Sequence, residues 1–125
     1  GDSMIEGIAD WLKDNQSLEE LHLTNCCLGN ESIHWLCQAI ERHTTLKYLA
    51  VDGYHYFDTL GERALASLLK ANPDLTLNLG HKISTDNPLE SYRLQGRVIC
   101  DRYPKAMSDF PEIYGELDFF SIPTQ

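Results

Sequence analysis

The chain has 125 residues, of which 42% are hydrophobic and 23% charged, so it is long enough for one hydrophobic core and too apolar for a disordered chain. Its 10 lysines and arginines against 19 aspartates and glutamates give a net charge of -9, and no basic cluster offsets it, which argues against nucleic acid as a partner. No apolar run approaches the ~20 residues that cross a bilayer, and the first residues lack the basic and apolar regions of a signal peptide.

These features predict a soluble, acidic protein without membrane insertion. Its 4 cysteines are too few and too irregularly spaced to staple a small secreted scaffold. We therefore expect a reducing compartment and a cytoplasmic location.

Apolar residues repeat along the first 80 residues at an offset of 28. Leu21, Leu49 and Leu77 form one series of this kind. The intervening segments follow the same offset, pairing Ile5 with Ile33, Ile8 with Leu36 and Ala64, Ala9 with Cys37 and Leu65, and Leu12 with Ile40 and Leu68. The apolar residues of the intervening segments are spaced like one face of a helix, whereas the leucines of the first series alternate with other residues as in a strand. Each unit of 28 residues is therefore predicted to hold one strand and one helix.

The expected elements, in chain order, are helices and strands that alternate, with the strands parallel and the helical crossovers right-handed. Their predicted ranges are a helix at 3–14, a strand at 20–24, a helix at 30–43, a strand at 48–52, a helix at 60–71 and a strand at 75–79. Ser3 and Thr59, each followed three residues later by a glutamate, match the capping box at a helix start. Asn30 is expected to cap the middle helix, and Pro73 to end the third.

The run LEELHLTNCCLG, from Leu18 to Gly29, resembles the leucine-rich repeat pattern L-x-x-L-x-L-x-x-N/C-x-L. The second unit opens in the same way at Leu46, and a period of 28 with a full helix resembles the ribonuclease-inhibitor-like subclass. The segments HTTLKYLAVDG and LTLNLG are also similar to the last repeats of tropomodulins. The resemblance implies an α/β fold, a short right-handed solenoid of three helix–strand units over residues 2–80.

The repeat pattern weakens toward its end. Asp74 occupies a position where leucine is expected, and Gly53 and Tyr54 stand where the first unit has Asn25 and Cys26. Residues 81–125 do not continue the period and contain four of the five prolines, so we predict an irregular cap or tail there. Within it, Tyr92 to Cys100 is expected to form a strand or short helix that covers the last repeat with Leu94, Val98 and Cys100.

Candidate binding residues lie on the strand face that points away from the leucines. Alternation places Glu20, His22 and Thr24 there, in register with Tyr48, Ala50 and Asp52 and with Thr76 and Asn78. The resemblance implies that this face docks protein partners. In the loop from Gly53 to Asp58 the offset directs Tyr54 and Tyr56 inward, which leaves His55 and Phe57 as exposed candidates. The competing interpretation is an ordinary solvated face, because three strands offer less area than the ~800 Å² of a standard interface.

The residue pattern favours a non-catalytic protein-interaction module, either a small adaptor or the terminal part of a larger repeat protein. The chain contains no glycine-rich phosphate loop, G-x-S-x-G or H-E-x-x-H motif, so we expect no enzymatic activity, no metal and no cofactor. Two alternatives stay open: a repeat segment of a larger enzyme or effector, and a metal or thiol site built from Cys26, Cys27, His34 and Cys37. Register opposes the second, because it directs His34 outward and Cys37 inward.

One further motif lies near the end of the chain. Glu112 to Leu117, EIYGEL, resembles the substrates of Src-type tyrosine kinases, so phosphorylation of Tyr114 is a side hypothesis. The alternative is that Tyr114 and its apolar neighbours pack on the domain.

Overall fold

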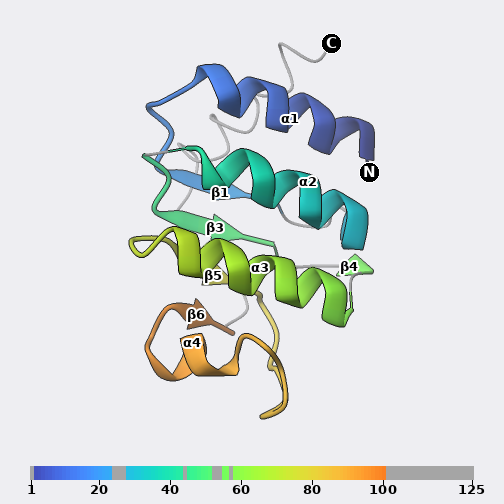
Figure 1. Ribbon diagram of the computed structural model, residues 1–125, viewed down its shortest axis with the longest axis vertical. Helices are drawn as coiled ribbons and strands as arrows, with labels where there is room; N and C mark the ends of the chain where they lie inside the picture. The colour runs from blue at the N-terminus through green and yellow to red at the C-terminus, as the bar shows by residue number, and fades with distance from the viewer. Residues whose placement is uncertain (1, 24–27, 44, 52–54, 57, 101–125) are drawn as a thin grey trace, which may run out of the picture.

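Helices and short strands alternate along the part of the chain that the computed structural model describes, which is residues 2–23, 28–43, 45–51, 55–56 and 58–100. The elements are α1 (Asp2–Asp14), β1 (Glu20–His22), β2 (Leu28–Gly29), α2 (Asn30–Glu41), β3 (Tyr48–Ala50), β4 (His55–Tyr56), α3 (Thr59–Ala71), β5 (Thr76–Asn78), α4 (Glu90–Leu94) and β6 (Val98–Ile99). Figure 1 shows them stacked along the long axis of the molecule, from α1 at one end to α4 and β6 at the other. The result is a mixed α/β fold.

The strands form a four-stranded parallel sheet in the order β1-β3-β5-β6. Leu21 lies opposite Leu49, and Leu49 opposite Leu77, so the strands are offset by the 28 residues that the sequence predicts. All three leucines are at most 1% exposed, which places them in one shared core. A second, two-stranded sheet joins β2 to β4.

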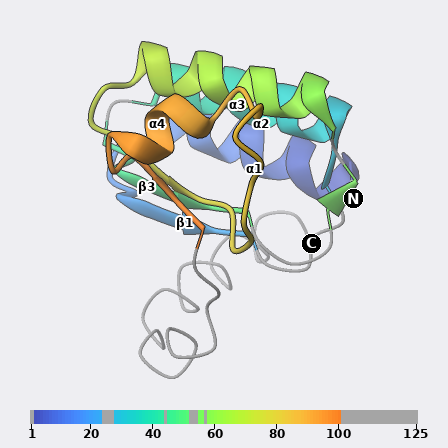
Figure 2. The same cartoon turned by 90° about the horizontal axis from the view of Figure 1, so that it is seen from below.

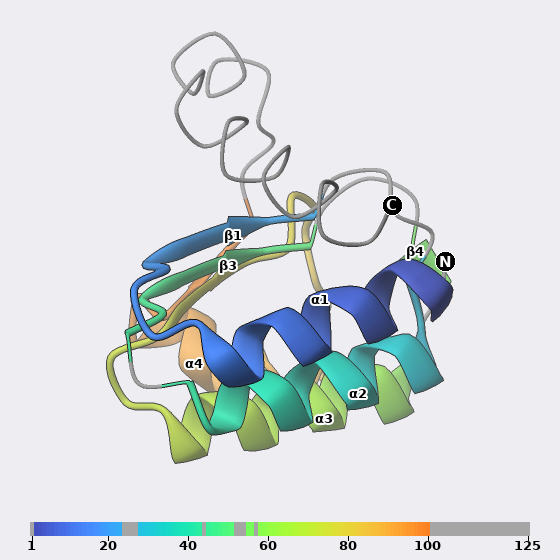
Figure 3. The same cartoon turned by 90° about the horizontal axis from the view of Figure 1, so that it is seen from above.

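Helices α1, α2 and α3 lie side by side and cover one face of the main sheet, as Figures 2 and 3 show from opposite ends. Between α1 and α2 the predicted offset of 28 is confirmed, because equivalent positions are equally buried. Ile5 and Ile33 are both 0% exposed, and Leu12 and Ile40 both 1%. Burying these aliphatic stripes stabilises the layered arrangement by about 25 cal/mol for each Å² of apolar surface that is removed from water.

The offset between α2 and α3 is 29 rather than 28. Leu36 and Leu65, both 0% exposed, occupy equivalent places, and so do Ile40 and Leu69. The predicted partner Ala64 is only half-buried. The extra residue arises before α3. Two residues separate β4 from Thr59, whereas Gly29 leads directly into α2, and the connection from β3 to β4 is one residue shorter than that from β1 to β2. The link from α3 to β5 is shorter in compensation, because strand pairing fixes the sheet register and the connections absorb the difference.

Two predicted helix caps were wrong. The cap of α3 is Asp58, whose side chain accepts a hydrogen bond from the backbone N–H of Leu60, so Thr59 is already the first helical residue. The cap of α2 is Gly29, without a side-chain bond, and Asn30 is the first residue of that helix. Helix α1 begins at Asp2, and the side chain of Ser3 lies outside the described residues. The predicted stop holds, since α3 ends at Ala71, two residues before Pro73.

The segment from Tyr92 to Cys100, which was expected to form a strand or short helix, contains the end of α4 and the strand β6, but not all of its expected side chains are buried. Strand β6 pairs with β5, Val98 is 3% exposed and Cys100 packs against the core. Leu94 is 72% exposed, which is contrary to the prediction, and the buried residue is Leu89. Leu89 and the partly buried Tyr92 share one face of the short α4, while Leu94 falls on the opposite face.

Candidate functional site

The face of the sheet that points away from α1, α2 and α3 is not covered by any of the described helices (Figures 2 and 3). Strand alternation directs the core leucines to the helical side and their neighbours to this side. Two rows of residues therefore cross the face in register: Glu20, Tyr48 and Thr76, then His22, Ala50 and Asn78. We call these six residues the open strand face.

Tyr48 connects the side chains of the open strand face. Its hydroxyl oxygen accepts a hydrogen bond from Nδ2 of Asn78 at 2.9 Å. Its ring lies 5.2 Å from the imidazole of His22, centroid to centroid, and Nε2 of His22 is 3.3 Å from Oε1 of Glu20. Asn78 is itself held, because its Oδ1 accepts from the backbone N–H of Gly80, which has a positive φ of 70°.

The open strand face is less exposed than the sequence predicts. His22 is only 5% exposed, Asn78 4% and Ala50 0%, whereas Glu20 is exposed and Tyr48 and Thr76 are half-buried. The ring of Tyr48 packs against His22 and its hydroxyl bonds to Asn78, so Tyr48 shields part of both side chains. Glu20, Tyr48 and Thr76 therefore offer the accessible contacts of this face, while His22 and Asn78 hold them in place.

Burial lowers the pKa of His22, and the hydrogen bond and charge of Glu20 act in the opposite direction. The imidazole is thus favoured in its neutral form, in which Nε2 can donate its proton to the Glu20 carboxylate. This bond orients the carboxylate at the margin of the open strand face.

Beside this network lies a hollow of about 290 Å³, lined by Glu19, Glu20, Lys47 and Tyr48. Glu19 and Lys47 are exposed residues that precede β1 and β3. Neither residue is predicted as a site residue from the sequence, because both stand outside the strands. Their position next to predicted open-face residues was the only signal.

Several predicted site residues lie outside the described part of the chain: Thr24, Asp52, Phe57 and Tyr114. The backbone of His55 is described, and it pairs with Leu28, one residue away from the predicted match of Leu28 with Tyr56. The connection from β3 to β4 is one residue shorter than that from β1 to β2, which accounts for the shift. The side chains of His55 and Tyr56 are not among those described.

Cys37 and His34 point in different directions, as the register predicts. Cys37 is 6% exposed, and burial, with a smaller contribution from Glu41, raises the pKa of its thiol to about 12. Such a thiol stays protonated and is a poor nucleophile. His34 is exposed, Cys26 and Cys27 lie outside the described residues, and no group of three His, Cys, Asp or Glu residues within the described ranges could hold a metal ion.

A second depression, of about 660 Å³, lies between the outer surfaces of α1 and α2. The small side chains of Ala9 and Ala39 line it together with Trp35, and Glu6 and Arg42 are among the charged residues around them. The sequence analysis did not identify this groove, because it treated Ala9 only as a core position.

The geometry defines a class of structure: a parallel sheet backed by a layer of helices on one side, with a polar and aromatic surface on the other. Human NACHT, LRR and PYD domains-containing protein 5 is similar in sequence, with 33% identity over 97 residues. These residues are 77% of this chain but only 8% of that protein, so the likeness is partial and distant. It is consistent with a relationship to proteins that contain leucine-rich repeats.

No family model matches the chain. Within the described residues, no helix combines the length and the apolar character that crossing a membrane requires.

Proposed function

We propose that the chain is a non-catalytic protein-interaction module, a short leucine-rich-repeat solenoid that presents its open strand face to a protein partner. In this proposal residues 2–80 form three repeats of the ribonuclease-inhibitor-like kind, and residues 81–125 form a C-terminal cap or tail. The single observation that carries it is the open strand face itself, where an accessible tyrosine is held by buried polar side chains on a sheet backed by helices.

Preorganisation is the physical reason why this face suits recognition. Binding normally costs the ordering of interface side chains, and this cost falls when hydrogen bonds already fix them. Tyrosine is enriched at the energetic centres of interfaces because it combines a large apolar ring with a polar tip. The partial likeness to a human protein with leucine-rich repeats supports the same function.

The proposal includes a cytoplasmic location and the absence of enzymatic activity. The buried, protonated thiol of Cys37 supports the second part, because it removes one member of the thiol cluster that the sequence left open.

The test is affinity capture from an extract of the source cells, followed by mass spectrometry and a binding titration with the captured protein. Thr76→Trp places a bulky side chain on the open strand face without removing a hydrogen bond that holds Tyr48. We expect it to weaken binding by about tenfold or more, since a central interface position tolerates little steric change. The matched control is Ser67→Trp on the exposed side of α3.

Equal affinities for Thr76→Trp, Ser67→Trp and the parent chain would contradict the proposed function. Tyr48→Ala is a less clear test, because it also leaves the buried amide of Asn78 without the hydroxyl that accepts its hydrogen bond.

A further inference from the structure

The hollow beside Tyr48 is a distinct feature of the open strand face. Its lining brings two carboxylates, Glu19 and Glu20, next to one ammonium group, Lys47, and one aromatic ring, Tyr48. Glu20 and Tyr48 are opposite each other in the register of β1 and β3, so carboxylate and ring lie on neighbouring strands. With both glutamates and the lysine ionised, the lining carries one uncompensated negative charge.

Two of the four lining groups are held in place. The hydroxyl of Tyr48 is bonded to Asn78 at 2.9 Å, and the ring packs against His22. The carboxylate of Glu20 is 3.3 Å from Nε2 of His22. The ring and this carboxylate therefore keep a fixed relation to each other, because one imidazole contacts both.

An aromatic ring beside carboxylates is the arrangement that attracts a cationic side chain. The face of a tyrosine ring draws a guanidinium or ammonium group within about 6 Å of its centre. Carboxylates accept the hydrogen bonds of that group, and arginine forms two at once. An anionic group would meet two carboxylates, and an apolar group would remove three charged side chains from water, so neither is favoured.

We propose that the hollow receives an arginine or lysine side chain of the protein partner. The inference rests on the proposed function, since it names the chemistry that the partner presents to the open strand face. One incoming positive charge balances the lining, and the overall charge of -9 draws basic segments toward the chain.

The test uses the full chain and two short probes, the peptides Ac-Gly-Arg-Gly-NH2 and Ac-Gly-Cit-Gly-NH2, in which citrulline is the neutral isostere of arginine. At low ionic strength, NMR titration is expected to show saturable shifts at the backbone amides of Glu19 and Glu20 and at the Tyr48 ring with the arginine peptide only. The double variant Glu19→Gln/Glu20→Gln is expected to weaken this binding by about fivefold or more, because the ion pairs are lost.

The matched control is Glu6→Gln/Asp10→Asn on α1, which removes the same charge away from the hollow. Equal shifts with the citrulline peptide, or equal losses in the two double variants, would overturn the inference.

The partner assay separates this inference from the proposed function. If Thr76→Trp weakens partner binding while the arginine peptide causes no saturable shift, the inference fails and the proposed function stands. If the arginine peptide binds in the hollow while Thr76→Trp leaves partner binding unchanged, the proposed function fails.

Discussion

Asn30 shows how one side chain stabilises the helix of the next unit. Its Oδ1 accepts hydrogen bonds from the backbone N–H groups of Asp58 and Gly61, both at 2.9 Å. Its Nδ2 donates to Oδ1 of Asp58 at 3.0 Å, and the same oxygen accepts from the N–H of Leu60. These bonds lower the pKa of Asp58 and satisfy donors that every helix leaves free at its start. Asn30 therefore supports the start of α3, where Asp58 is the cap, rather than the start of its own helix α2.

Replacement of Asn30 by alanine is expected to lower the free energy of unfolding by about 2 kcal/mol, because two backbone donors at the start of α3 lose their acceptor. Urea denaturation followed by circular dichroism measures the change. Gln38→Ala, which removes an amide from an exposed position of α2, should stay within about 0.5 kcal/mol of the parent chain. Equal effects of the two substitutions would show that Asn30 does not stabilise α3.

At the scale of elements, Arg97 joins the start of β6 to the segment between α3 and β5. Its Nη2 donates to the backbone oxygens of Asn72 at 2.6 Å and of Leu75 at 2.9 Å. Its guanidinium carbon lies 5.5 Å from the centre of the Tyr92 ring. A cation at this place is also stabilising because it lies near the negative, C-terminal end of the α3 dipole.

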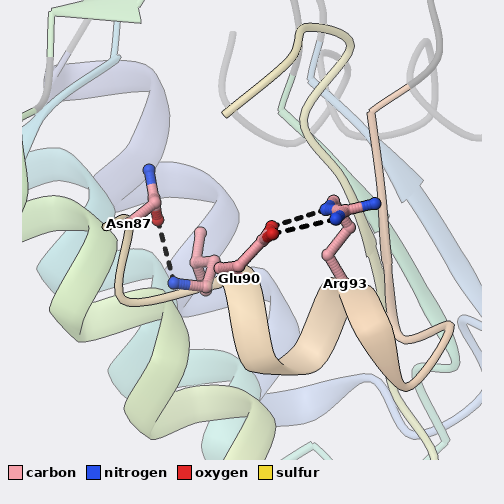
Figure 4. A network of polar contacts seen from close by, with 4 residues as sticks. Asn87, Glu90 and Arg93 are labelled. Carbon is pink, nitrogen blue, oxygen red and sulfur yellow. Dashed lines mark hydrogen bonds and ion pairs between the residues drawn. The ribbon is translucent and has the colours of Figure 1, made fainter. Parts of the chain in front are cut away.

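The segment before β6 is organised by side chains around α4, as Figure 4 shows. Oδ1 of Asn87 accepts from the backbone N–H of Leu89 at 2.8 Å, and its Nδ2 donates to Oε2 of Glu62 on α3. Glu90 and Arg93 form an ion pair, with Nη2 and Oε2 2.8 Å apart. The hydrogen bond between them is the main cause that lowers the pKa of Glu90 and raises that of Arg93, and the attraction of their opposite charges contributes less.

These contacts predict different roles for Arg93 and Arg97. Arg97→Ala is expected to lower the free energy of unfolding by about 2 kcal/mol, because two partly buried backbone carbonyl groups lose a charged donor. Hydrogen exchange at the amides of Val98 and Ile99 should become faster, since β6 is the element that Arg97 holds. Arg93→Ala removes only an exposed pair, so it should lower the free energy of unfolding much less than Arg97→Ala. Unchanged exchange in Arg97→Ala would refute the assignment.

At the scale of the whole molecule, two buried histidines couple folding to pH. Burial lowers the pKa of both His22 and His43 below 6.5, with Glu20 opposing the shift at the first and the backbone of Asn15 at the second. His43 is 2% exposed, and its Nδ1 accepts a hydrogen bond from the backbone N–H of Leu46 at 3.2 Å. Protonation of Nδ1 would abolish this bond, so the folded state favours neutral imidazoles.

The stability that these groups confer is therefore present above pH 6.5 and lost as the pH falls below it, because the unfolded chain then binds protons that the folded chain resists. We expect the urea midpoint to fall between pH 7.5 and pH 5. His43→Asn, whose amide oxygen can replace Nδ1 as acceptor, should reduce this fall. The exposed His34→Asn is the control, and an identical pH dependence in both variants would count against the role of His43.

The amino-acid sequence by itself determined the helices α1, α2 and α3, the parallel strands β1, β3 and β5, and most residues of the core between them. Periodicity is a local property, because it depends only on how far each residue turns and rises along its own element. The buried leucines Leu21, Leu49 and Leu77 and the apolar stripes of α1 and α2 follow it. The 28-residue offset followed from the same regularity.

Only the tertiary structure decided what lies between the units. The 29-residue offset of α3, the hydrogen bonds of Asn30 to the start of that helix and the burial of His22 and Asn78 all depend on contacts between different units. The same holds for the hollow beside Tyr48, where the Glu20 carboxylate and the Tyr48 ring come from two neighbouring strands. Periodicity describes one element at a time, and the distances that create these features exist only after the elements have packed together.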